Sequence, residues 1–129
     1  MANLSEQKSI NFKEVKVARL KIDSDEAFEK KANAFKALGD AYVKEVNSLL
    51  KRQTGYVVKD FNEILDCVTR SQKENDRFDV APLIAIDYQV VAGYAYIIKL
   101  HKRWFKALHE WTELNNALAV AKAELDCNK

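Results

Sequence analysis

The sequence contains few of the residues that interrupt regular structure. Among 129 residues there are only three glycines, one proline and two cysteines. These counts exclude collagen, flexible linkers and disulfide-stabilised miniproteins, and a β-sandwich normally needs more turn residues. The hydrophobic content, 48%, is too high for a disordered chain and sufficient for one domain with a core. The composition therefore predicts an all-α fold.

Neither charge nor cysteine is concentrated in a way that identifies a partner. Twenty-one Lys and Arg against nineteen Asp and Glu give a net charge of +2, which does not by itself indicate nucleic acid or an anionic membrane. Cys67 and Cys127 lie far apart and lack metal-site or CxxC spacing, so we expect reduced thiols. Because no apolar segment follows basic residues near residue 1, we expect no secretion signal and a cytoplasmic protein.

The spacing of apolar residues predicts a bundle of three or four helices. The first expected helix covers residues 23–52 and begins with an acidic cluster at its positive end. Apolar residues then recur every seven positions, as in a coiled coil. These are Phe28, Phe35, Tyr42 and Leu49. A second helix is expected over residues 55–72, with Thr54 as its cap.

The last expected helix is much longer than the others. It covers residues 81–127, with Pro82 in the first turn, where proline is tolerated. Gly93 and Asn115 are the places where it could break. The sequence therefore predicts a very long or kinked C-terminal helix within one domain.

Residues 1–22 are expected to form an arm or short strand, because Val15 and Val17 alternate with charged residues. The order VKVARLKI, FEKKANAFKAL, Gly39-Asp40 and AYVKEVNSLLKR resembles the ribbon-helix-helix family of DNA-binding modules. That resemblance implies a dimer whose strands enter the major groove through Val17, Arg19 and Lys21. The heptad spacing, which continues across Gly39, favours one uninterrupted helix there instead.

The most hydrophobic stretch covers residues 83–100. It is about long enough to cross a bilayer, but Asp87 and Gln89 interrupt it and Lys99 closes it. We therefore expect a buried core helix and no membrane partner.

Three polar residues are expected on the inward side of the C-terminal helix: Asp87, His101 and Asn115. A buried Asp87 needs a Tyr hydroxyl or a Lys or Arg as partner, or else is an acid with a perturbed pKa in a pocket. His101 is more typical of a hydrogen-bonded core residue than of a base. Asn115 could fix the register of a helical seam. The sequence has no nucleotide-binding, nucleophile or zinc motif, so we expect no enzyme, no metal and no cofactor.

Two groups on the C-terminal helix are candidate contact surfaces. The first is a basic face that nucleic acid could use, together with Arg19 and Lys21, although Glu110 could pair with part of it. That face consists of Lys99, Lys102, Arg103 and Lys106. The second is an apolar and aromatic face that would serve either the core or a protein interface. It consists of Tyr94, Ile97, Trp104, Leu108, Trp111 and Leu118.

These patterns lead to one preferred function and one alternative. The preferred function is a non-enzymatic interaction or adaptor protein that self-associates and presents its C-terminal helix to a protein partner. The alternative is a regulatory or accessory protein that binds DNA or RNA.

Overall fold

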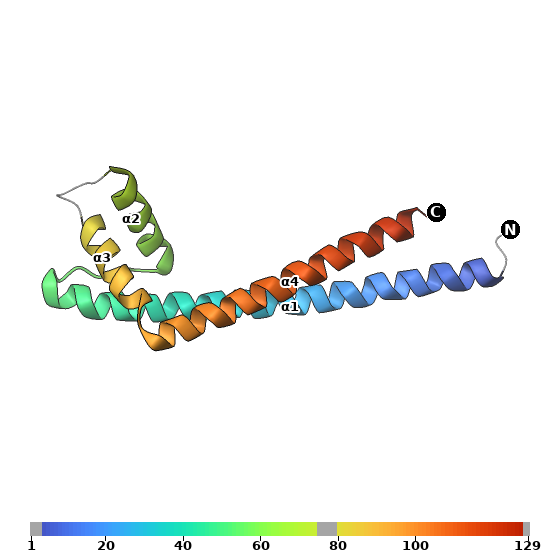
Figure 1. The fold of residues 1–129 in the computed structure, drawn as a ribbon, viewed down its shortest axis with the longest axis horizontal. Helices are drawn as coiled ribbons and strands as arrows, with labels where there is room; N and C mark the ends of the chain where they lie inside the picture. The colour runs from blue at the N-terminus through green and yellow to red at the C-terminus, as the bar shows by residue number, and fades with distance from the viewer. Residues whose placement is uncertain (1–3, 75–79, 128–129) are drawn as a thin grey trace. The chain divides into compact units, whose positions relative to one another are not determined.

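A computed structural model describes residues 4–74 and 80–127, and these residues form four helices without a strand (Figure 1). The helices are α1 (Leu4–Gln53), α2 (Phe61–Glu74), α3 (Ala81–Ala92) and α4 (Ala95–Asp126). The all-α prediction with a long C-terminal helix is confirmed. The chain divides into two compact units. We call residues 34–104 the central unit, and residues 1–33 with 105–129 the terminal unit.

The prediction of an arm or strand over residues 1–22 is wrong from Leu4 onward, because α1 already runs through this segment. The alternation of Val15 and Val17 suggested a strand, but only Val17 belongs to the shielded series of side chains. That series steps by three and four residues, which is the period of a helix. Its members are Val17, Leu20, Ser24, Ala27 and Lys31. The strand required by a ribbon-helix-helix module is therefore not formed.

Gly39 lies inside α1 and allows α2 to approach closely. A Cβ atom built at Gly39 would lie 3.1 Å from Cβ of Phe61, the first residue of α2. Further along α1, a row of fully buried side chains faces the core of the central unit. This row comprises Leu38, Tyr42, Val46 and Leu50. Its spacing of four residues keeps it on one side of the helix.

The link between α1 and α2 is held by side-chain hydrogen bonds. The Asn47 side chain forms two hydrogen bonds with the backbone of Val58. Its Nδ2 donates to the carbonyl oxygen of Val58 at 3.0 Å, and its Oδ1 accepts from the amide of Val58 at 2.6 Å. Thr54, the expected cap of the second helix, instead donates to the carbonyl oxygen of Leu50. The cap of α2 is Asp60, whose Oδ1 accepts from the amide of Glu63 at 2.9 Å. The second helix therefore begins about one and a half turns later than expected.

The C-terminal helical segment breaks at Gly93, one of the two places predicted, and not at Asn115. The amides of Gly93 and Tyr94 each donate to a carbonyl oxygen three residues earlier, which closes α3 with a tight turn. At this break α3 and α4 are bent by 84° relative to each other. The apolar stretch at residues 83–100 is thus split between two helices.

Candidate interaction surfaces

The terminal unit is a pair of antiparallel helical segments with small residues at their contact. Phe28 of α1 meets Trp111 of α4 with ring centroids 5.9 Å apart, and Lys30 pairs with Glu110 at 4.0 Å. The buried positions along this pair are mostly small. They are Ser24, Ala27, Ala107, Leu118 and Ala121. Small side chains let the two backbones come close, but they bury little apolar area.

Large apolar side chains of the same unit are exposed instead. On α1, Phe12 is 71% exposed, Ile22 59% and Val15 58%. At 100° per residue these three lie roughly 140° around the helix from the row that faces α4. They share their side of α1 with Arg19 and Glu26. We call this side, residues 12, 15, 19, 22 and 26, the outer face of α1.

Sequence reasoning missed the outer face of α1 because it expected a strand there. The signal was present, since residues 12, 15, 19 and 22 follow the spacing of three and four that marks one side of a helix.

Charges flank the outer face in two blocks of opposite sign. Residues 13–21 contain Lys13, Lys16, Arg19 and Lys21 with one acid, Glu14, for a net charge of +3. Residues 23–29 contain four acids and no base, for a net charge of −4. Ile22 lies between the two blocks. Most of these side chains are exposed.

The centre of the central unit is an aromatic cluster around Tyr42, which is fully buried. Its ring stacks between Phe61 at 5.2 Å and Tyr88 at 4.9 Å. The hydroxyl forms a 2.7 Å hydrogen bond with Nε2 of His101, so His101 is the hydrogen-bonded residue that the sequence indicated. Burial, and then the neighbouring Tyr88, raise the pKa of Tyr42 above its usual range. This cluster joins α1, α2, α3 and α4 through ring contacts.

Asp87 of α3 is buried as expected, at 4% exposure. Among the described residues its Oδ2 has no hydrogen-bond partner, so the expected Tyr, Lys or Arg partner is not present at this atom. Burial raises the pKa of the Asp87 carboxyl, because the charged form loses its hydration. Asp87 does not line the pocket described below.

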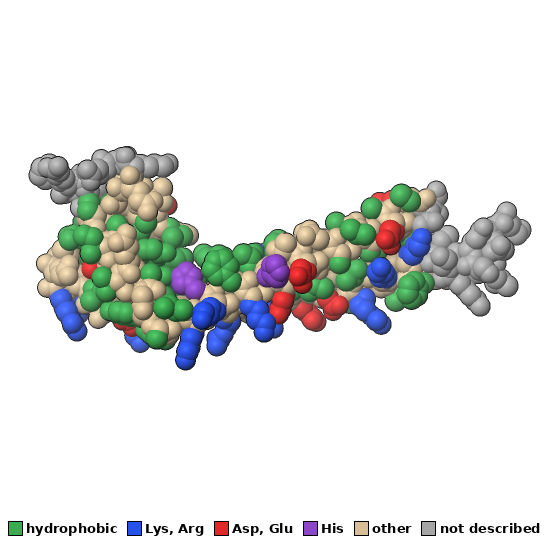
Figure 2. All heavy atoms as spheres, in the orientation of Figure 1, with side chains coloured by type: hydrophobic (Ala, Val, Ile, Leu, Met, Phe, Trp, Pro, Cys, Tyr) green, Lys and Arg blue, Asp and Glu red, His purple; other side chains and the backbone are tan. Residues whose placement is uncertain are grey.

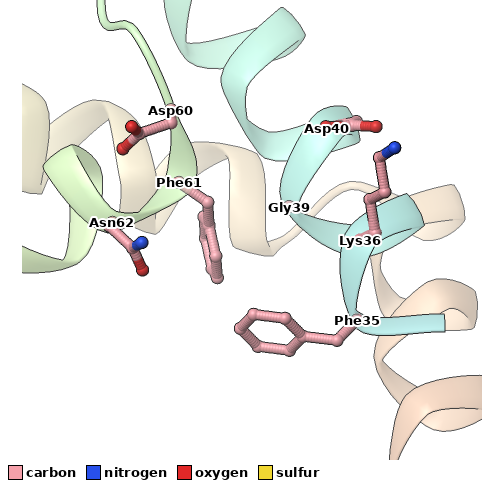
Figure 3. A pocket seen from close by; sticks show the side chains of 7 residues that line it. All are labelled: Phe35, Lys36, Gly39, Asp40, Asp60, Phe61 and Asn62. Carbon is pink, nitrogen blue, oxygen red and sulfur yellow. The ribbon is translucent and has the colours of Figure 1, made fainter. Parts of the chain in front are cut away.

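A pocket of about 260 Å³ lies between α1 and α2 in the central unit. Figure 3 shows the rings of Phe35 and Phe61 at its centre, with Lys36 and Asp40 on α1 and Asp60 at the start of α2. Its charged side chains have mixed signs, and Asp60 already caps α2. The pocket therefore favours no particular ligand chemistry.

The apolar face expected on α4 is turned toward α1 of the same chain. Trp104 meets Phe35 at 5.4 Å within the central unit, and Trp111 meets Phe28 within the terminal unit. Of the other predicted interface residues, Ile97 and Leu118 are buried and Tyr94 and Leu108 partly buried. This face is therefore largely used inside the chain.

Outward-facing apolar residues of the central unit occur on α3 instead, where the sequence predicted a core helix. Leu83, Ile86 and Val90 are exposed on this helix. No exposed charge accompanies them, because α3 contains no Lys or Arg and its one acid, Asp87, is buried. Figure 2 shows hydrophobic surface in the region of α2 and α3. At the start of α4, Tyr96 and Ile98 are also exposed. Burial of the Tyr96 hydroxyl, and then its hydrogen bond to Glu45, raise the pKa of Tyr96 to about 12.

All six basic residues named as nucleic-acid candidates are exposed: Arg19, Lys21, Lys99, Lys102, Arg103 and Lys106. Lys21 pairs with Asp25 at 4.0 Å along α1.

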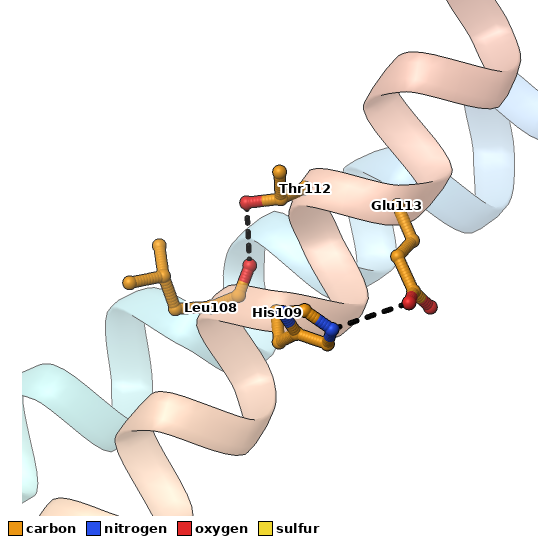
Figure 4. Close-up of polar contacts among 4 residues, drawn as sticks. All are labelled: Leu108, His109, Thr112 and Glu113. Atoms are coloured by element: carbon orange, nitrogen blue, oxygen red, sulfur yellow. Dashed lines mark hydrogen bonds and ion pairs between the residues drawn. The ribbon is translucent and has the colours of Figure 1, made fainter.

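Beyond the basic residues, α4 carries local polar contacts. His109 Nε2 lies 3.3 Å from Glu113, and Thr112 donates to the carbonyl oxygen of Leu108 (Figure 4). Asn115 is exposed, because the inward row passes through Leu114 and Leu118, so it does not take the inward position that the sequence indicated.

The described residues contain no group of three or more His, Cys, Asp or Glu side chains that could hold a metal ion. Cys67 is buried and Cys127 exposed, and neither forms a disulfide within the described residues. Within the described residues no single helix is long and apolar enough to cross a membrane, whereas the bent pair α3 and α4 reaches that length and hydropathy together.

Comparison with protein-family models, with curated proteins and with solved structures finds no match for this chain.

Proposed function

We propose that this chain is a non-enzymatic helical interaction protein that self-associates through the outer face of α1. The observation that carries the proposal is the distribution of side-chain size in the terminal unit. Small residues such as Ala27 and Ala121 are buried there, while Phe12, Val15 and Ile22 are mostly exposed. Exposed apolar residues at helical spacing are typical of a helix that packs against a further helix.

A second copy of the chain fits this face when the two α1 helices run antiparallel. A two-fold axis beside Ile22 would place the basic block of each copy against the acidic block of the other. In this arrangement Arg19 of one copy lies near Glu26 of the other. A parallel pair would instead oppose like charges along the whole segment. The charge pattern therefore supports the antiparallel pair.

The proposal changes the surface that the sequence suggested. Trp104 and Trp111 contact α1 within the chain, so we place the self-association surface on α1 rather than on the aromatic face of α4. The function as an interaction protein is retained, and the interface moves to α1.

Sedimentation equilibrium tests the proposal by comparing Val15→Ser with Val120→Ser. Both valines lie in the terminal unit and are 58% exposed, but Val120 lies on α4. Burying the exposed part of Val15 contributes about 1 kcal/mol per copy, so Val15→Ser should weaken a symmetric dimer about 30-fold. Val120→Ser should leave the dissociation constant unchanged. A wild-type chain that stays monomeric, or equal effects of both variants, would refute the proposal.

The orientation is tested by reversing charges. In an antiparallel dimer Arg19→Glu places two acids together, and the double variant Arg19→Glu with Glu26→Arg restores the pairing. We therefore expect weaker association for the single variant and recovery for the double variant. In a parallel dimer residue 19 faces residue 19 and residue 26 faces residue 26, so each substitution only replaces one like-charge pair by another. The double variant should then not recover association, and that result would exclude the antiparallel arrangement.

A further inference from the structure

A second outward apolar surface lies in the central unit and is independent of the α1 interface. Leu83, Ile86 and Val90 follow the spacing of three and four residues on one side of α3, and 36 to 57% of each residue is exposed. The one charged residue of α3 is Asp87, which is buried on a different side of the helix. Over residues 83–90, about two turns, the outer side of α3 therefore presents no charged side chain to solvent.

Beyond the bend, the first turns of α4 carry exposed apolar side chains and then basic ones. Tyr96 and Ile98 are exposed at the start of α4, and Lys99, Lys102 and Arg103 follow within the next two turns. No Asp or Glu occurs between residues 88 and 109. Glu45 of α1 accepts the hydrogen bond of the Tyr96 hydroxyl.

We propose that the outer side of α3 and the first turns of α4 bind the surface of an anionic lipid membrane. Apolar side chains without charges suit the boundary of the acyl region, tyrosines concentrate at the membrane interface, and lysines and arginines attract anionic headgroups. The two helices supply these three components in that order along the chain.

The length of α3 determines that it lies on the membrane rather than across it. Its 12 residues extend about 18 Å, which is shorter than the hydrocarbon core of about 30 Å. The buried side of α3, with Asp87 and Ile84, stays packed in the central unit. Only the outer side chains then enter the interface, as in other peripheral helices.

A nucleic acid is the competing occupant for the basic residues, but it does not explain the apolar ones. Phosphate contacts need only the cationic side chains. An exposed Ile86 or Val90 adds nothing to such a site, whereas a lipid interface uses both components.

Co-sedimentation of the full chain with vesicles tests the proposal. The probes are vesicles of pure phosphatidylcholine and vesicles of phosphatidylcholine with phosphatidylserine. We expect binding to the mixed vesicles only, with a strong decrease as salt is raised. Binding to neither type at low salt, or to both types equally, would overturn the proposal.

Two pairs of matched variants identify the surface. Replacing Lys99, Lys102 and Arg103 by Gln should weaken binding about fivefold per charge removed. The same replacement of Lys44, Lys51 and Arg52, which are also exposed, should have little effect. Ile86→Ser should weaken binding, whereas Val57→Ser should not, although both side chains are 57% exposed.

The same variants distinguish other occupants. If the Gln variant loses duplex binding while Ile86→Ser retains vesicle binding, the basic residues serve nucleic acid and the proposal fails. If the assembly formed by Ile86→Ser has a different sedimentation mass from that formed by the wild type, the α3 surface is a protein interface and the proposal also fails. Neither result bears on Val15→Ser, so failure here is distinguishable from failure of the α1 dimer.

Discussion

Replacing Asp87 by Asn should change how the stability of this protein depends on pH. Asp87 is 4% exposed and its Oδ2 has no partner among the described residues, so ionisation places a charge in an apolar environment. Burial therefore raises the pKa of this carboxyl in the folded state. In the unfolded chain the same group titrates near a pKa of about 3.9.

The sign follows from proton binding. Between the unfolded and the folded pKa of Asp87, the folded state holds more protons, so the free energy of unfolding falls as pH rises. The wild type is expected to lose up to about 1.4 kcal/mol per pH unit in this range from this group alone. The loss stops above the folded pKa. Asp87→Asn does not titrate and should lose none of this stability.

Urea denaturation of both proteins from about pH 4 to 7 measures the effect. The quantity of interest is the free energy of unfolding of the variant minus that of the wild type, because other titrating groups cancel in this difference. We expect the difference to increase with pH and then level off. A difference that stays constant or decreases would show that the Asp87 carboxylate is hydrated or paired, and would refute the reasoning.

Three other substitutions probe the central unit. Gly39→Ala should not stabilise α1 by the usual helix gain of about 1 kcal/mol, because the new Cβ lies 3.1 Å from Cβ of Phe61. In a Phe61→Gly background, which removes that Cβ, urea denaturation should recover the gain. Tyr42→Phe removes the hydrogen bond to His101 and should lower the free energy of unfolding by about 1 to 2 kcal/mol; a double-mutant cycle with His101 that shows no coupling would contradict this. Hydrogen bonds from the Tyr56 hydroxyl, and then from the amide of Lys59, lower the pKa of Glu63 in the folded state. The ionised Glu63 therefore stabilises the fold above its unfolded pKa of about 4.3, and this stabilisation is lost as pH falls through the folded pKa. In Glu63→Gln the free energy of unfolding should decrease less steeply as pH is lowered through this range.

Local sequence signals predicted some features well. The scarcity of Gly and Pro indicated helices, and Gly93 marked the break between α3 and α4. The start of α2 was misplaced because Thr54 and Asp60 are both suitable caps by residue type. Tertiary contacts, such as the two hydrogen bonds between Asn47 and Val58, hold residues 54–60 as a link before the new helix begins.

The two candidate surfaces could not be predicted in the same way. An apolar residue is compatible with the core, with an interface or with a membrane, and its sequence spacing is identical in each case. The sequence therefore predicts a core helix that includes Leu83, Ile86 and Val90, whereas the structure leaves these three residues exposed.

The sequence by itself determined that this protein is helical and restricted the break in its last helical segment to two places, Gly93 and Asn115. Only the tertiary structure decided which side of each helix is buried. In the heptad row of α1 Tyr42 is fully buried, but Phe28 and Phe35 are exposed and Ala27 and Ala34, one position earlier, are buried instead. A shift of one residue turns a helix by about 100°, so the large side chain that follows each buried alanine points away from the buried side. The large side chains are thereby left outside.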